Sequence, residues 1–97
     1  MARPDLLSEE LINDHIQANP LWSLSGKTIY REIAASTFVA AIGIVNSIAI
    51  LAEVADHHPD ILIYGWNKIR ITLSTHDKGG LTIHDFELAK KIDKLKF

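Results

Sequence analysis

The chain has 97 residues, enough for a single domain (residues 1–97) with a modest core, and its 47% hydrophobic and 23% charged residues are typical of a globular protein. Ten basic and twelve acidic side chains give a net charge of −2, which excludes the basic surface expected of a nucleic-acid-binding protein. The chain has no cysteine, so disulfides, thiolate catalysis and thiolate metal sites are excluded, and we expect a cytoplasmic protein.

The first third of the chain predicts a short helix followed by a β-hairpin. Ser8 precedes two acidic residues and has the character of a helix N-cap, and Asn19-Pro20 ends the helix. Two short segments, Leu21–Leu24 and Thr28–Ile33, have strand character on either side of the turn residues Ser25-Gly26. We expect these two segments to pair as a hairpin.

A second helix is predicted from Ser36 or Thr37 to about Asp56, and its apolar residues go most of the way round. A helix that is apolar on all sides must be buried on all sides, whereas so small a domain usually covers only one face. We therefore predict that helix 36–55 forms an interface between identical subunits, in a dimer or a tetramer. The alternative is that neighbouring loops cover the second face. The apolar run from 38 to 52 is shorter than the roughly twenty residues of a membrane-spanning helix, so no membrane is expected.

The last third predicts a second hairpin and a final helix. Strand character extends over Asp60–Trp66 and Lys68–Ser74, with the turn at Asn67-Lys68. A glycine-containing loop follows, and Thr82 with Asp85 three residues later resembles a capping box that starts the helix. The fold class is therefore α+β in the order α-β-β-α-β-β-α, a four-stranded antiparallel sheet with the helices packed on one face.

Four of the five histidines lie between residues 53 and 85, and a carboxylate stands at each end of that stretch. The unperturbed pKa of imidazole lies near neutrality, so clustered histidines indicate proton transfer or metal binding. Glu53 and His57 are four residues apart at a helix end, which predicts a hydrogen bond between them. The second hairpin can return His76 towards His57, so that two imidazoles and Asp85 form a general acid and base.

Other interpretations of the same residues remain open at this point. An adjacent histidine pair is often a surface or packing feature, and Asp85 on its own is equally well explained as a helix cap. A metal site from His57, His58 and His76 with a carboxylate is allowed by residue type, but adjacent histidines diverge and chelate poorly, so we predict none. His15 and His84 receive no functional role.

Three segments together resemble the pterin-4a-carbinolamine dehydratase family: Glu53-x-x-x-His57-His58-Pro59, then Ile71-Thr72-Leu73-Ser74-Thr75-His76, then Gly80-Leu81-Thr82-x-x-Asp85. The resemblance extends over nearly the whole chain. It implies a hydro-lyase that converts 4a-hydroxytetrahydropterin (4a-hydroxytetrahydrobiopterin) to quinonoid dihydropterin and water, in tetrahydrobiopterin recycling. It also implies the same order of helices and strands, a tetramer built on the long second helices, and no metal or organic cofactor.

The same resemblance assigns roles to individual residues. His57 and His76 become the general acid and base, in an order that the sequence leaves open, and Asp85 sets the orientation and protonation of an imidazole. Contacts with the pterin substrate, direct or through a neighbouring histidine, are implied for Glu53, His58, Pro59, Ser74 and Thr75.

One departure from the family pattern is an extra residue before Trp66, which we interpret as Gly65 accommodated in a β-bulge. Such a bulge would redirect the side chains of Tyr64 or Trp66 and leave His76 in place. Two alternatives to the enzyme are a pterin-binding protein without turnover, for example one that binds a molybdopterin-related compound, and a dimerisation cofactor of a homeodomain transcription factor.

Overall fold

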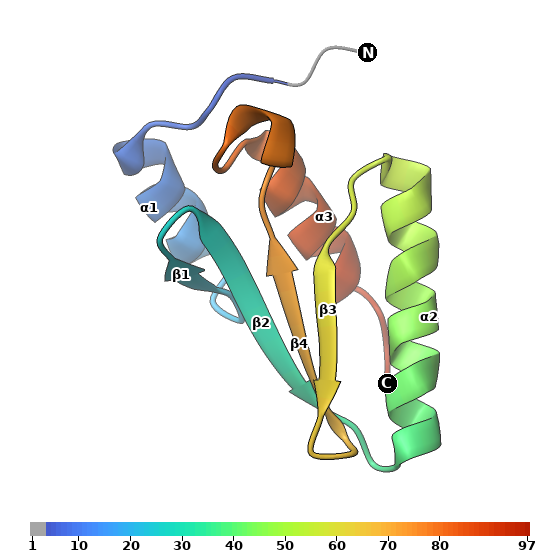
Figure 1. Cartoon of the computed structure of the whole chain (residues 1–97). Helices are drawn as coiled ribbons and strands as arrows, with labels where there is room; N and C mark the ends of the chain where they lie inside the picture. The colour runs from blue at the N-terminus through green and yellow to red at the C-terminus, as the bar shows by residue number, and fades with distance from the viewer. Residues whose placement is uncertain (1–3) are drawn as a thin grey trace.

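The computed structural model describes residues 4–97, so the first three residues of the predicted domain lie outside the described part. The α+β class, the antiparallel sheet and the predicted order of elements are confirmed. The elements are α1 (Glu9–Ala18), β1 (Ser23–Ser25), β2 (Thr28–Ala34), α2 (Phe38–Ala55), β3 (Asp60–Tyr64), β4 (Lys68–Leu73), the 3-10 helix η1 (His76–Lys78) and α3 (Ile83–Asp93). The chain forms one sheet, with α3 behind it and α2 along its right-hand side in Figure 1.

The four strands are all antiparallel to their neighbours, in the order β1-β2-β4-β3. Ile29 on β2 pairs with Leu73 on β4, and Ile33 pairs with Ile69, so these side chains lie on the same face of the sheet. All four are buried against the helices. The core therefore lies between one face of the sheet and the helix layer, and the opposite face is open.

Side-chain caps fix where the helices begin. Ser8 Oγ accepts from the backbone N–H of Leu11 at 3.2 Å, and Thr37 Oγ1 accepts from that of Ala40 at 3.0 Å. Thr82 starts α3 as the first residue of a full capping box. The three predicted helix starts are therefore confirmed, with Thr37 rather than Ser36 at the start of α2.

Helix α2 packs on the sheet with only one of its faces. The buried positions recur at helical spacing, and they are Ala41, Ile44, Ile48 and Ala52. The other side is apolar but exposed, with Val39 and Val54 both 79% accessible. By length and composition alone this helix is apolar enough to cross a membrane, although its buried stripe belongs to the core. Neighbouring loops therefore do not cover the second face of α2 within the single chain.

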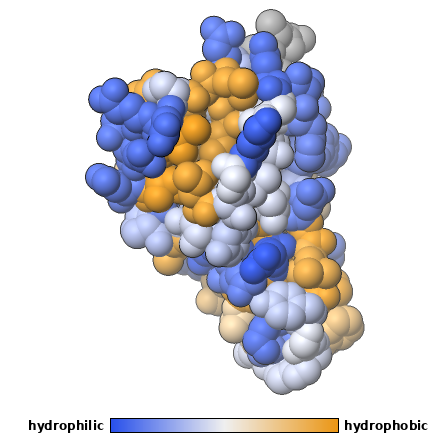
Figure 2. All heavy atoms as spheres, turned by 60° about the vertical axis from the view of Figure 1, so that its left-hand side comes forward, coloured by the Kyte–Doolittle hydropathy of each residue, from blue (hydrophilic) through white to orange (hydrophobic). Residues whose placement is uncertain are grey.

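Apolar side chains also reach the surface on the opposite side of the molecule. Figure 2 brings the side that carries α1 and β1 forward and shows hydrophobic patches bordered by hydrophilic residues. Leu21 and Leu24, next to and within β1, are 55% and 44% exposed. Exposed leucines are thus not confined to α2.

The loop between β3 and β4 differs from the prediction. Strand β3 ends at Tyr64, which pairs with Lys68, and the three residues between them form the turn. Gly65 and Trp66 both have positive φ, 54° and 60°. Positive φ suits a hairpin turn and costs glycine little, so the extra residue is accommodated in the turn. The predicted β-bulge at Gly65, the strand end at Trp66 and the turn at Asn67-Lys68 were wrong.

Candidate active site

The end of α2 separates two neighbouring histidines. Asp56 caps the helix in the left-handed conformation, with φ 49°, and the N–H of His57 donates to the carbonyl of Ala52 at 3.1 Å. The chain reverses direction here before β3 begins. As a result His57 turns inward and is only 5% exposed, whereas the side chain of His58 is 57% exposed.

The His57 ring meets a buried carboxylate from the first turn of α3. His57 Nε2 lies 2.6 Å from Asp85 Oδ1, and Asp85 is fully buried. The second oxygen, Oδ2, accepts from the hydroxyl of Thr75 and from the backbone N–H of Thr82, each at 2.9 Å. Residues from the end of α2, the segment after β4 and the start of α3 are thereby joined in one buried polar cluster.

The predicted hydrogen bond between Glu53 and His57 is absent, and this prediction was wrong. Glu53 Oε1 instead lies 2.6 Å from Nε2 of His58, five residues on. The reason is that α2 ends at Ala55, so His57 lies beyond the helix and the spacing rule for helical neighbours does not reach it. The His58–Glu53 pair lies on the surface.

His76 opens η1 and does not end a strand, because β4 stops at Leu73. Its side chain is exposed and makes no hydrogen bond, ion pair or ring contact with any residue in the described part of the chain. The structure therefore does not bring the imidazoles of His76 and His57 into contact, and the ring of His76 is exposed to solvent.

The remaining predicted binding residues lie at different depths. Pro59 and Ser74 are half-buried, at the start of β3 and just after β4. Thr75 is fully buried, and its N–H and carbonyl are both used within the 75–80 loop, bonded to Gly80 and its neighbours. This places Thr75 behind Asp85 rather than at the surface where a substrate would arrive.

Two residues to which sequence reasoning gave no site role belong to the same neighbourhood. The ring centroid of His84 lies 6.0 Å from that of His57, and His84 Nδ1 lies 3.4 Å from Glu87 Oε1. Thr82 was predicted only as a helix cap, yet its hydroxyl also contacts that of Thr75 at 2.8 Å. The available signal was their position beside Asp85 in the capping box.

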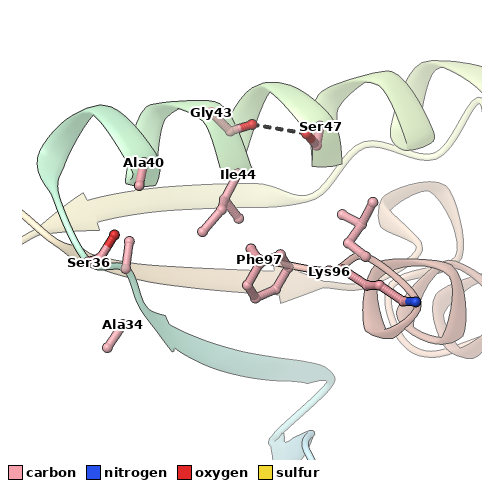
Figure 3. A pocket seen from close by; sticks show the side chains of 10 residues that line it. Ala34, Ser36, Ala40, Gly43, Ile44, Ser47, Lys96 and Phe97 are labelled. Carbon is pink, nitrogen blue, oxygen red and sulfur yellow. Dashed lines mark hydrogen bonds between the residues drawn. The ribbon is translucent and has the colours of Figure 1, made fainter.

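A hollow of about 690 Å³ lies elsewhere, between the first half of α2 and the C-terminal residues. Figure 3 shows Phe97 and Ile44 facing each other across it and the hydrogen bond from Ser47 to the carbonyl of Gly43. The only titratable side chain that lines it is Lys96, and it contains none of the predicted site residues. The hollow and the His57 cluster are therefore separate parts of the molecule. Among residues 4–97, no group of three or more histidine or acidic side chains is arranged to hold a metal ion.

Comparison with known proteins shows which family the chain resembles over nearly its whole length. The family model described as "Pterin 4 alpha carbinolamine dehydratase" matches residues 5–95. Relatives in Prochlorococcus marinus and Nocardia farcinica, both named "Putative pterin-4-alpha-carbinolamine dehydratase", are 44% and 48% identical. The first alignment covers 93% of this chain and 94% of the relative, and the second covers 94% and 95%.

Solved structures show the same fold. A protein described as a "transcriptional coactivator/pterin dehydratase" from Brucella melitensis superposes with a TM-score of 0.84 at 31% identity, covering 92% of this chain and 96% of that one. A pterin dehydratase-like protein described as a RuBisCO assembly factor of the alpha-carboxysome superposes with a TM-score of 0.61 at 23% identity. The superposition covers 74% of this chain and 84% of that one. At that identity the second likeness concerns the fold alone.

Proposed function

Because the chain belongs to the pterin-4a-carbinolamine dehydratase family, we propose that it dehydrates 4a-hydroxytetrahydropterin to quinonoid dihydropterin and water. The observation that carries the proposal is the buried His57–Asp85 pair, 2.6 Å apart, in a chain that also presents His58 and His76 at the surface. These are the residue types that a proton-transfer reaction needs.

The reaction requires two proton transfers and no redox step. The C4a–oxygen bond breaks as the leaving hydroxyl takes a proton, and a ring N–H gives up its proton so that its electron pair forms the new C=N bond. One group must therefore donate and another must accept. We assign these roles to His57 and His76. No electrons are gained or lost, so the step has no need of a redox cofactor.

The other residues orient these groups or the substrate. Asp85 orients the His57 ring through the contact between Oδ1 and Nε2. The exposed His58, paired with Glu53, is the part of the site that is able to contact the flat pterin directly, with Pro59 and Ser74 as half-buried neighbours. Thr75 acts through Asp85, because its hydroxyl is donated to that carboxylate.

His76 gives the cleanest test of the function, because its side chain has no partner among residues 4–97 whose loss would unfold the protein. We expect His76→Ala to keep the fold and to lower kcat by about 10² or more, the usual contribution of a general acid or base. The measurement is the rate at which 4a-hydroxypterin, made in place by an aromatic amino acid hydroxylase, disappears.

The matched control is Lys78→Ala, an exposed residue of the same 3-10 helix, which should leave the rate unchanged. His57→Ala is the second arm, with circular dichroism to follow its fold. Full activity in both histidine variants would refute the proposed chemistry. A wild-type protein that binds pterin but does not turn it over would favour the non-catalytic pterin-binding alternative.

We also propose that the uncovered face of α2 is an interface between copies of this chain, in a dimer or a tetramer. Val39 and Val54, near the two ends of the helix, are each 79% exposed, and between them Ile42 and Ile50 are 39% and 66% exposed, so exposed apolar side chains recur from one end of the helix to the other. Apolar surface of this extent on a small domain is stabilised by burial against a partner. A second copy satisfies this requirement because it presents the same apolar face.

Charge on this face should break the assembly. We expect Val39→Glu with Val54→Glu to shift the protein to monomers in sedimentation velocity, whereas Leu21→Glu, a 55% exposed leucine outside α2, should leave the assembly unchanged. A wild-type protein that is monomeric at high concentration would contradict the proposal. In that case the exposed face of α2 would be expected to bind a different protein, as in the transcription-cofactor alternative.

A further inference from the structure

We propose that Thr82 and Thr75 are positioning residues that hold His57 in the tautomer with its proton on Nε2, so that Nδ1 is the atom that accepts a proton. The catalytic consequence rests on the proposed function, whereas the tautomer itself does not. The inference comes from a buried chain of hydroxyls behind Asp85. Thr75, Thr82 and Asp85 are each 0% exposed.

The direction of each hydrogen bond in this chain follows from counting protons. The Thr75 hydroxyl donates to Asp85 Oδ2 at 2.9 Å. A hydroxyl has one proton, so in the 2.8 Å contact between the two threonine hydroxyls it must be Thr82 that donates. Thr82 Oγ1 in turn accepts from the backbone N–H of His84 at 3.2 Å. These hydrogen bonds therefore all donate in the same direction, from the start of α3 towards the carboxylate of Asp85.

Two donors converge on one oxygen of Asp85. Oδ2 receives the Thr75 hydroxyl and the backbone N–H of Thr82, each at 2.9 Å, and in both of these hydrogen bonds the proton comes from the threonine. Oδ2 can therefore only accept, and the carboxylate is left to meet His57 through Oδ1 at 2.6 Å. A carboxylate oxygen pairs with an N–H, so the proton of the neutral ring belongs on Nε2.

The other ring nitrogen of His57 is then unprotonated and available. No buried side-chain nitrogen or oxygen among the described residues lacks a hydrogen-bond partner. Nδ1 of His57 has no partner in the described part of the chain, so it must be one of the atoms that reaches the surface. Its lone pair is therefore not occupied by a protein donor, and the ring of His84 is a neighbour at 6.0 Å.

The tautomer can be read directly by long-range ¹H–¹⁵N NMR of ¹⁵N-labelled protein, at a pH where the ring is neutral. Protonated and unprotonated ring nitrogens resonate in separate regions. For the wild type we expect Nε2 to carry the proton. For Asp85→Asn we expect the reverse, because the amide oxygen must face the Thr75 and Thr82 donors and its NH₂ must then face Nε2 of His57.

The threonines are tested with shape-matched pairs. Thr75→Val and Thr82→Val remove a hydroxyl and should give a mixture of tautomers, whereas Thr75→Ser and Thr82→Ser should retain the wild-type form. In the dehydration assay we expect the valine variants to lose about three- to tenfold in kcat, the scale of one hydrogen bond, and the serine variants to recover it.

The control is Thr37→Val, which removes the same kind of helix cap from α2 without touching Asp85 and should leave both tautomer and rate unchanged. A wild-type ring protonated on Nδ1, or a valine variant with an unmixed Nε2–H tautomer, would overturn the proposal. If a valine variant fails to fold, the spectra of the wild type and of Asp85→Asn still test the proposed tautomer of His57. A correct tautomer without dehydration would refute the proposed function and leave the positioning role intact.

Discussion

Two adjacent histidines each pair with a carboxylate, and the two pairs differ in almost everything except length. His57–Asp85 and His58–Glu53 are both 2.6 Å long. The side chains of His57 and Asp85 are 5% and 0% exposed, whereas those of His58 and Glu53 are 57% and 77% exposed. Two hydrogen bonds of equal length can therefore contribute differently to stability and to the site, because burial and the neighbouring hydrogen-bond partners set that contribution.

The buried pair is part of a network of buried hydrogen bonds that meet at Asp85. Without Asp85, the ring of His57, the hydroxyl of Thr75 and the N–H of Thr82 would all lose their acceptor in a place that water does not reach. The exposed pair can exchange its partner for water at little cost, because both side chains remain solvated. The first pair therefore supports the fold and the site geometry, whereas the second is free to rearrange around a ligand.

The largest expected effect is the loss of the buried carboxylate. We predict that Asp85→Ala lowers the free energy of unfolding by about 3–5 kcal/mol, because three buried donors lose their acceptor. Glu53→Ala, the matched change in the exposed pair, should stay within about 0.5 kcal/mol of the wild type. Urea denaturation of both variants measures the two changes in the free energy of unfolding. Equal changes would contradict the prediction that the buried pair contributes more to stability than the exposed pair.

A smaller effect is expected from the coupling within the exposed pair. A double-mutant cycle with His58→Ala and Glu53→Ala should give a coupling free energy of about 0.2–1 kcal/mol, which falls further as salt is added. The measurement is urea denaturation at low and high ionic strength. A coupling free energy insensitive to salt would show that this pair is screened from solvent in the assembled protein.

The smallest effect concerns a third pair, on the open face of the sheet, where Arg70 Nε donates to Glu32 Oε1 at 2.8 Å. The Arg70 hydrogen bond, and then one from Tyr64, hold the pKa of Glu32 below its ordinary 4.5. A lowered pKa in the folded state means that the stabilisation is complete above pH 4.5 and is lost as the pH falls through the lower value.

Acid titration of stability tests this prediction. The stability difference between the wild type and Glu32→Gln should be constant above pH 4.5 and shrink below it. The effect should be slight because both side chains are exposed, at 47% for Arg70 and 41% for Glu32. A difference that grew as the pH fell would contradict the sign.

Local patterns predicted most of the fold. Helix starts followed from cap residues such as Ser8 and Thr82, and the strands from alternation such as that of Ile69 and Ile71, because these signals act over a few residues. The predictions failed at element ends. The turn at Gly65 and the start of η1 at His76 depend on backbone dihedral angles, and a glycine indicates where a turn is tolerated but does not set its exact bounds.

The sequence by itself determined the order of the elements, the apolar excess of α2 and the presence of two imidazoles and a carboxylate in the stretch that resembles the family. Only the tertiary structure decided which carboxylate belongs to which histidine. The left-handed cap at Asp56 turns His57 away from Glu53 and towards Asp85, 28 residues further along the chain. Contacts over such a separation are set by how the sheet and helices pack, so spacing rules for a single helix do not reveal them.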